Sequence, residues 1–547
     1  MYAAQNITPT VLDAMNGNVS EWYNECDNAI RRSEIVPGTY EYTTAVSYGN
    51  VGEFGEGSST TVDITCDRFH IISLDNSFLY VEQDIVLKSN VALNAKIGCN
   101  KVFYVGYQYA PEVFMGYKVY SNSDLVQTVT WANYEWFALR NSVQPQAREQ
   151  TDQYATIEKI RRLDPNVPGV YVDMSDLNDA TKSLKVKLKL RVPLSSFLIF
   201  RFLRYLPNWA GKVSIELMPS KNNLVIAPTE DPYTITADTA AHVEFGTWCR
   251  TKHDLDFGFS NLNNELRYFF DGADAGALDW DPIKITCEKF EVKRIESRCA
   301  VYMLDPDISN ALAFKYIAVP LMFPIHQISV KDFAGNVGNT GAGRTDTALT
   351  TAMKHADTMF ILFRKSLNDF SCFYNPGIKY HINIDGKYYP REEYDSVDDM
   401  RSYNLTLDAM NFNNNFTTTI NPEMQSSIQP YTYKWKKTGN QDANDANTLI
   451  CKQEAEYTNG DRSNFWIGIP FADSEDFMGG ISTVGTVQIQ YTGDRVGPAG
   501  FKDVGFIKPI ALFTEDALLK IRSMKPAGAP QIGITTASIE QILAAGQ

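Results

Sequence analysis

Apolar and polar residues alternate strictly along many short segments of the chain, the period-two pattern of half-buried β-strands. In LKVKLKLRV at 184–192, leucine and valine fall on one face and lysine and arginine on the other. KVSIELM at 212–218 and TVQIQYT at 486–492 repeat the pattern, and loops rich in Gly, Asn, Asp and Ser separate such segments. The pattern predicts a mainly β fold with a few helices, at 144–162, 195–206 and 514–523.

The same strand-like segments recur in order in the two halves of the chain, which indicates an internal duplication. We therefore predict two β-domains of one design, an eight-stranded jelly roll at 56–225 and a second at 245–515, joined by a linker at 226–244. Cys66 and Cys287 occupy equivalent places in this alignment, which favours packing over chemistry for both. The matched pairs are ITCDRF (64–69) with ITCEKF (285–290), KVFYV (101–105) with TMFIL (358–362), GYKVY (116–120) with GIKYH (377–381), RVPL (191–194) with GIPF (468–471), and GKVSIEL (211–217) with GTVQIQY (485–491).

The two ends of the chain differ from its middle. Residues 1–55 hold a possible helix followed by extended chain, and residues 516–547 hold a Pro- and Gly-punctuated segment that closes with a short amphipathic stretch. Such segments are weakly stable alone and gain order by docking. We predict an N-terminal and a C-terminal arm that reach between subunits.

Composition narrows the class of protein. The chain has 547 residues, 44% of them hydrophobic and 12% aromatic, so it can bury a large core. A formal net charge of −15 argues against a protein that wraps nucleic acid. The N-terminal residues show no secretory signal, no segment is apolar for the length of a membrane span, and the eight cysteines form no C-x-x-C pair. A reduced intracellular folding compartment with buried thiols fits this pattern.

GNTGAGRT at 338–345 resembles a phosphate-binding loop, but Arg344 stands where the motif needs lysine. Arginine is bulkier and forked, so it is not a neutral replacement. Seven residues also separate Gly338 from the strand-like HQISV at 326–330, whereas a phosphate-binding loop follows its strand directly. The segment falls where the second domain carries an insertion, and we predict a long surface loop.

No other segment combines the residues of a catalytic or metal site. FFDGADAGALDWD at 269–281 is acidic but lacks the spacing of a calcium loop, so an acidic turn is expected. The six histidines are scattered, and no nucleophile motif occurs. Arg201 and Arg204 interrupt an apolar stretch and serve either a subunit contact or a partly buried helix whose charges reach solvent. We predict no catalytic, cofactor or metal residues and no enzymatic activity.

With two tandem β-domains, inserted loops and terminal arms, the chain resembles the double jelly-roll major capsid proteins of adenoviruses (hexons), tailless membrane-containing phages and large DNA viruses, and most closely those of virophages and polinton-like elements. The likeness covers about 56–515 and lies in strand order and length. The segments that carry it are 67–87, 117–137, 192–217, 378–390 and 469–491.

The resemblance implies a structural protein of the virion, made and assembled inside the host cell. Its homotrimer would be a pseudo-hexagonal capsomer that tiles an icosahedral shell of a double-stranded DNA virus. Loops 331–357 and 436–464 would project outward, and the arms would link neighbouring capsomers on the inner floor. Penton and other minor capsid proteins would be partners, an inner membrane or packaged DNA would be touched only indirectly, and no small-molecule substrate or cofactor is implied.

A carbohydrate-binding or adhesin-like protein with two β-sandwich domains is the alternative. Such a protein would be expected to carry a secretory signal, calcium sites and aromatic platforms on exposed loops. A glycoside hydrolase would need two carboxylates converging in a cleft, and the sequence nominates no such pair.

Overall fold

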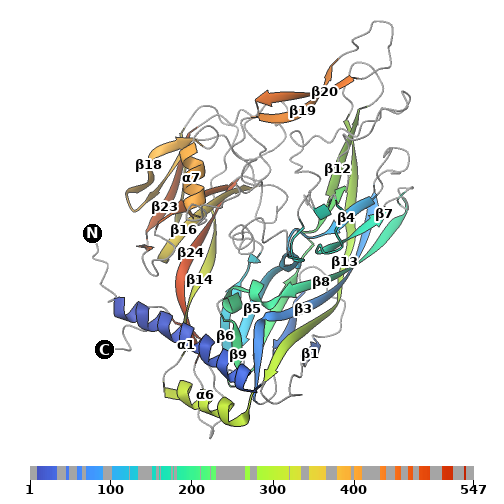
Figure 1. Ribbon diagram of the computed structural model, residues 1–547. Coiled ribbons are helices and arrows are strands. Elements are labelled where there is room, and N and C mark those ends of the chain that lie inside the picture. The colour runs from blue at the N-terminus through green and yellow to red at the C-terminus, as the bar shows by residue number, and fades with distance from the viewer. Residues whose placement is uncertain are drawn as a thin grey trace.

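A computed structural model gives the arrangement of the strands and helices (Figure 1). The structure describes the following residues: 9–33, 45–48, 58–64, 69–89, 102–121, 124–132, 151–155, 159–160, 162–173, 177, 181–201, 203–207, 209, 211–221, 223–228, 265–271, 280–318, 321–333, 344–364, 379–395, 400–409, 431–438, 450–457, 466–471, 480–483, 485–492, 508–521 and 535–537.

Eight strands build the first β-sandwich. One sheet has the order β1-β13-β3-β8 and the other has the order β2-β10-β5-β6, with every pairing antiparallel. Counted along the chain, the first sheet takes strands one, eight, three and six, and the second takes two, seven, four and five. This is the arrangement of a jelly roll. The strands are β1 (Ala45–Tyr48), β2 (Thr60–Ile64), β3 (His70–Ser89), β5 (Phe114–Ser121), β6 (Asp124–Val129), β8 (Ser183–Pro193), β10 (Val213–Pro219) and β13 (Trp280–Met303).

Eight later strands repeat the arrangement. Their sheets have the orders β14-β24-β16-β21 and β15-β23-β17-β18, which are again strands one, eight, three, six and two, seven, four, five. The fold is therefore a double jelly roll. The strands are β14 (Leu321–Asp332), β15 (Arg344–Thr350), β16 (Met353–Arg364), β17 (Lys379–Ile384), β18 (Lys387–Asp395), β21 (Trp466–Pro470), β23 (Thr486–Thr492) and β24 (Lys508–Ile521).

The remaining elements extend these sheets or lie in connections between the strands, except α1, which precedes the first strand. β9 (Tyr205–Pro207) pairs with β3, β12 (Glu265–Asp271) with β13, β22 (Ile481–Thr483) with β16, and β25 (Thr535–Ala537) with β24. The others are α1 (Pro9–Ser33), β4 (Val102–Gly106), η2 (Ala110–Val113), β7 (Gly169–Asp173), η4 (Leu194–Ser196), α5 (Leu198–Arg201), β11 (Val225–Pro228), α6 (Pro306–Ala318), α7 (Met400–Ala409), β19 (Tyr431–Thr438) and β20 (Ile450–Tyr457).

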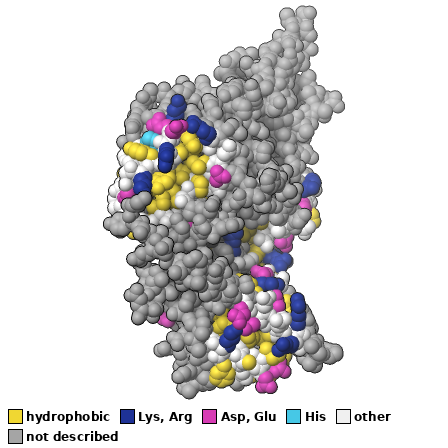
Figure 2. Space-filling model, turned by 60° about the vertical axis from the view of Figure 1, so that its left-hand side comes forward, with side chains coloured by type: hydrophobic (Ala, Val, Ile, Leu, Met, Phe, Trp, Pro, Cys, Tyr) yellow, Lys and Arg dark blue, Asp and Glu magenta, His cyan; other side chains and the backbone are white. Residues whose placement is uncertain are grey.

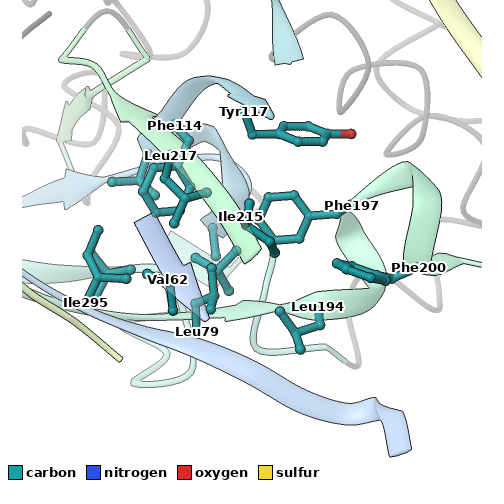
Figure 3. Close-up of a cluster of buried hydrophobic side chains, with 14 of the residues drawn as sticks. Val62, Leu79, Phe114, Tyr117, Leu194, Phe197, Phe200, Ile215, Leu217 and Ile295 are labelled. Atoms are coloured by element: carbon teal, nitrogen blue, oxygen red, sulfur yellow. The ribbon is translucent and has the colours of Figure 1, made fainter. Parts of the chain in front are cut away.

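Each roll has its own apolar core between its two sheets. In the first, Val62, Leu79, Ile215 and Leu217 are fully buried, and Ile295 contributes from β13 (Figure 3). The alternating pattern predicted for β8 and β10 is confirmed, because exposed and buried positions alternate along both strands. The second core includes Tyr380, Ile382 and Ile489.

Three of the five duplicated segments occupy equivalent strands. GYKVY and GIKYH lie on β5 and at the start of β17, RVPL and GIPF span the ends of β8 and β21, and GKVSIEL and GTVQIQY lie on β10 and β23. The other two pairs are not equivalent. Ile64 of ITCDRF ends β2, the second strand of the first roll, whereas ITCEKF lies in β13, the eighth strand of the same roll. KVFYV falls at β4, which is not one of the eight strands of the first roll, whereas TMFIL lies in β16, the third strand of the second roll. Because ITCDRF and ITCEKF are not equivalent, the predicted equivalence of Cys66 and Cys287 is wrong.

The strand pairing also changes the domain boundaries that the sequence predicted. β13 pairs with β3 along most of its length, so residues 280–303 belong to the first roll and not to the second as predicted. We propose that the division between the rolls lies between Met303 and Leu321, where α6 stands, and not at 226–244. The predicted arms overlap roll strands as well, since β1 falls within 1–55 and β24 runs beyond 516.

Predictions for loops and helices have mixed outcomes. The predicted loop 331–357 contains β15 and parts of β14 and β16, whereas 436–464 contains the end of β19 and all of its hairpin partner β20. Short helices η4 and α5 lie in the predicted helix 195–206, which then ends in the strand β9. The predicted helix 514–523 is mostly β24. The described part of 144–162 shows turns and a bridge at Tyr154 and helix only at 159–160.

Candidate assembly surfaces

Three connections at one end of the first roll fold into a small sheet. β4 follows β3, β7 precedes β8 and β11 follows β10, and they pair in the order β11-β4-β7 (Figure 1, right). Tyr104 is fully buried there among Ala155, Ile160, Val167 and Val225, and its hydroxyl donates a hydrogen bond of 2.7 Å to the Tyr107 carbonyl. The end of the roll is therefore a packed platform.

The pairing of β4 with β7 depends on two glycines. A Cβ placed on Gly169 would meet the Tyr104 ring and the Val105 carbonyl at 2.6 Å, and one placed on Gly106 would meet the Gly169 Cα at 2.5 Å. Real Cβ atoms are not found at such distances, so neither position accepts a side chain without a shift of the strands.

We expect Gly169→Ala to lower the free energy of unfolding by about 1–3 kcal/mol, because the added methyl overpacks the contact with Tyr104. The measurement is thermal and denaturant unfolding, with hydrogen exchange of 102–106 reporting the local effect. Thr128→Ala, on an exposed position of β6, is the control and should change stability by about 0.5 kcal/mol or less. Equal unfolding temperatures for Gly169→Ala and wild type would contradict this close packing.

The opposite end of the first roll is closed by α1 and α6. Trp22 of α1 is fully buried, and its ring makes edge contacts with Trp209 at 5.8 Å and with Tyr316 of α6 at 5.2 Å between ring centroids. Trp209 and Tyr316 stack at 5.8 Å. We call Trp22, Trp209 and Tyr316 the base cluster. α1 also contacts β14 of the second roll and β13 of the first, so the helix connects both rolls.

Polar contacts surround the base cluster. Lys315 pairs with Glu21 at 2.6 Å and also with Glu25, and the Tyr316 hydroxyl donates to Glu25 at 2.7 Å. Burial and this hydrogen bond raise the pKa of Tyr316 above its usual value. For Lys315, desolvation lowers the pKa, but the hydrogen bonds to the two glutamates outweigh it and leave a net rise. At physiological pH Lys315 is therefore charged and Tyr316 is neutral.

Arg204 joins α1 to the first roll. Its guanidinium lies 3.5 Å from Asp27 of α1 and 3.6 Å from Asp75 of β3. Burial raises the pKa of Asp75, which Arg204 only partly offsets. These two contacts link α1 to β3 of the first roll.

The outer face of the sheet β1-β13-β3-β8 carries nine Lys or Arg side chains and five carboxylates. Three of its carboxylates are shielded from solvent, since Glu296 is fully buried and Asp84 and Glu291 are each 9% exposed. Each of the three pairs with Lys or Arg side chains of the same face. Arg191 lies 4.6 Å above the Phe78 ring and Arg298 lies 4.9 Å above that of Tyr80. The charged residues of this cationic face are Lys88, Lys185, Lys187, Lys189, Arg191, Lys289, Lys293, Arg294 and Arg298, with Glu82, Asp84, Glu288, Glu291 and Glu296.

One carboxylate of the cationic face gives stability a dependence on pH. Hydrogen bonds from Lys289 and Lys293 lower the pKa of Glu291 from 4.5 to about 2. A carboxylate with a lowered pKa stabilises the fold fully above its usual pKa and loses that contribution as the pH falls towards the folded value. We expect the free energy of unfolding to fall between about pH 5 and pH 2, and Glu291→Gln to reduce this slope.

Denaturant unfolding across that pH range is the measurement. Glu288→Gln is the matched control, because it removes a carboxylate of the same face whose pair with Lys88 at 3.0 Å is well exposed. Identical slopes for wild type and Glu291→Gln would contradict the assignment to Glu291.

A second surface lies on the outer side of the sheet β15-β23-β17-β18. Figure 2 shows hydrophobic side chains gathered there among Lys, Arg, Asp and Glu. Tyr388 is 41% exposed, and its ring lies 4.6 Å from that of His381. At the β18 edge of this sheet, Arg401 of α7 pairs with Glu392 at 3.0 Å and lies over the Tyr394 ring. Exposed aromatic and arginine side chains are enriched at protein interfaces.

An open polar cavity of about 410 Å³ lies beside β8. Asp152 in its wall pairs with Arg191 at 3.5 Å, and Asp164 accepts a hydrogen bond of 2.8 Å from the Asn166 backbone. The buried Lys159 ammonium donates to the Thr151 carbonyl at 2.5 Å. Both carboxylates are thus already engaged with protein groups.

The remaining sequence candidates are placed as follows. Arg344 and Thr345 begin β15, which pairs with β23, so the end of GNTGAGRT is roll strand; its residues 338–343 lie outside the described part of the chain. The acidic stretch 269–281 links the paired strands β12 and β13, and 272–279 lie outside the described residues. Cys26, Cys287 and Cys299 are buried free thiols, and burial raises the pKa of Cys26.

Two further properties hold for the described residues. They contain no group of three or more His, Cys, Asp or Glu that could hold a metal ion. None of the helices that they form is both long and apolar enough to cross a membrane.

By sequence, the chain matches no protein-family model and no curated protein. By structure, it is similar to several viral capsid chains. The mavirus major capsid protein shares 11% identity over 92% of this chain and 93% of its own, with a TM-score of 0.48. A chain of the Sputnik virophage shares 11% over 93% and 91%, with a TM-score of 0.45. The Faustovirus major capsid protein shares 11% over 95% and 99%, with a TM-score of 0.37.

Proposed function

We propose that this chain is a structural major capsid protein that trimerises into pseudo-hexagonal capsomers of an icosahedral double-stranded DNA virus shell. The observation that carries the proposal is the duplicated roll, with the same strand order in both sandwiches. Three chains around a three-fold axis would present six bodies of similar design, and closed symmetric assembly is the usual state of such oligomers. The outline would then be close to hexagonal without true six-fold symmetry.

The two ends of the molecule would face opposite sides of such a shell. The platform of β4, β7 and β11 and the hairpin β19–β20 lie towards one end (Figure 1, top), and α1 and α6 lie at the other. In the proposal the first end faces outward and the base faces inward. Neighbouring capsomers, penton and other minor capsid proteins are the proposed partners. An inner membrane or packaged DNA is touched only indirectly.

The proposed mechanism is assembly, in which binding energy takes the place of chemistry. Obligate subunit interfaces bury on the order of 2,000–5,000 Å² and have apolar centres with polar rims. Aromatic and charged side chains lie together on both outer sheet faces described above, which supports their use in such contacts. The proposed location is the virion, after synthesis and assembly in the host cell.

Light scattering after size exclusion, followed by electron microscopy, tests the proposal on the full chain. The expected result is a particle with three times the 61.5 kDa mass of the chain and a hexagonal outline. A monomer at all concentrations would overturn the proposal. A monomer that is retained on a carbohydrate column would support the adhesin-like alternative.

A further inference from the structure

We infer that the cationic face of the first roll binds an acidic surface on a second copy of this chain. The inference rests on the proposed function and names the surface that self-association would use. Its most accessible part is β8, where Lys185, Lys187, Lys189 and Arg191 all point outward and are exposed.

This face has more Lys and Arg side chains than its carboxylates can pair with. Asp84 pairs with Lys185 at 2.7 Å, Glu291 with Lys289 and Lys293, and Glu296 with Arg294 and Arg298. Glu82, opposite Lys189 in the strand register, accepts the Tyr80 hydroxyl at 2.8 Å. Among the described residues, neither Lys187 nor Lys189 forms an ion pair with any carboxylate.

The excess of cations runs against the charge of the whole chain. The net charge of the chain is −15, whereas this face has nine cations and five carboxylates. All other surfaces taken together are therefore more acidic than the chain as a whole. A second copy thus offers the complementary charge, and opposite charges steer association and fix orientation.

In the second roll, a helix covers the strand that corresponds to β8. β21 occupies the place of β8 in that roll, and its first four residues are buried. α7 packs on this strand, and the Gly468 backbone N–H donates to the Thr406 hydroxyl of α7 at 3.0 Å. A Cβ on Gly468 would meet Ala409 at 2.9 Å, so the helix lies close against the strand. β8 instead presents alternating lysines and arginine to solvent.

Lysines also protect exposed strand edges against aggregation, which is the simpler explanation of this pattern. The two explanations predict opposite changes in particle size. Removing a protective charge leads to larger, irregular species, whereas reversing a binding charge leads to smaller ones.

The experiment compares the full-length wild type with Lys187→Glu/Lys189→Glu, by mass photometry and sedimentation at low and high salt. The control is Arg31→Glu/Arg32→Glu, which makes the same charge change at two exposed arginines in the last turn of α1, away from both outer sheet faces. Circular dichroism and the unfolding temperature confirm that each variant is folded. We expect the Lys187→Glu/Lys189→Glu variant to self-associate at least about tenfold more weakly, and wild-type self-association to weaken with salt.

Several results would overturn the inference. These are unchanged association of the variant, larger irregular particles, an equal loss in the control, and a loss of binding to duplex DNA with self-association intact. A wild type that never leaves the monomeric state overturns the proposed function itself. A trimeric wild type beside an equally trimeric Lys187→Glu/Lys189→Glu variant overturns only the inference about this face.

Discussion

Ile295→Asp is expected to unfold the first roll and to leave the second roll folded. Ile295 is 3% exposed and lies in the first core, where its backbone faces Val81 in the register of β13 with β3 (Figure 3). A carboxylate at this position is buried without a partner and leaves an apolar gap. The expected loss of stability is about 4–5 kcal/mol or more, as large as single substitutions produce.

Hydrogen exchange resolved by segment is the measurement. Amides of β3 and β10 should lose protection, whereas those of β16 and β23 should keep it. Ile382→Asp is the matched control, because Ile382 is fully buried in the second core and the same substitution there should give the reverse pattern. Loss of protection in the second roll alone by Ile295→Asp would show that β13 belongs to that roll.

Trp22→Ala should detach α1 from the rolls and lower the free energy of unfolding by about 3–5 kcal/mol. The ring is fully buried between Trp209 and Tyr316, so its removal leaves a cavity in the base cluster. Thermal unfolding gives the change in stability, and limited proteolysis within 9–33 reports release of the helix.

Trp22→Phe separates loss of volume from loss of the aromatic ring, and should cost less than Trp22→Ala because it keeps an edge contact. Glu21→Gln alters the exposed ion pair with Lys315 on the same helix and should change stability by about 1 kcal/mol or less. A helix that resists proteolysis equally in Trp22→Ala and wild type would show that the base cluster does not hold α1.

The sequence predicted the strand type well where one face of a strand is buried and the other is solvated. Alternation identified β8 and β10, whose buried and exposed positions follow the pattern residue by residue. The duplication was found correctly at the fourth, sixth and seventh strands of each roll. It was misassigned at ITCEKF, because short apolar segments resemble one another whichever strand they form.

Long-range pairing could not be read from local patterns. β13 comes much later in the sequence than the other strands of its roll, and its pairing with β3 and β1 shows where it belongs. The helix predicted at 514–523 failed for a related reason, since β24 pairs with β14 on one side and β16 on the other, and pairing overrides helical propensity.

For the cationic face, the sequence showed the alternation of charged and apolar residues along β8 but not that β8 lies at the edge of its sheet. Whether a strand lies at an edge is a property of the sheet order, and among the described strands β8 stands at the end of its sheet. The base cluster was missed altogether, because Trp22, Trp209 and Tyr316 come from three distant segments.

The pairing of β1 with β13 determines how much of the chain must be synthesised before the first sheet can form. Ala45 lies opposite Cys299, so the ribosome must make more than half of the protein before the first sheet can close. Until then β3 lacks its neighbour on one side and exposes unpaired backbone groups. Contacts this distant in sequence form slowly. A nascent chain paused before residue 280 should therefore recruit chaperones, whereas the folded full-length chain should not.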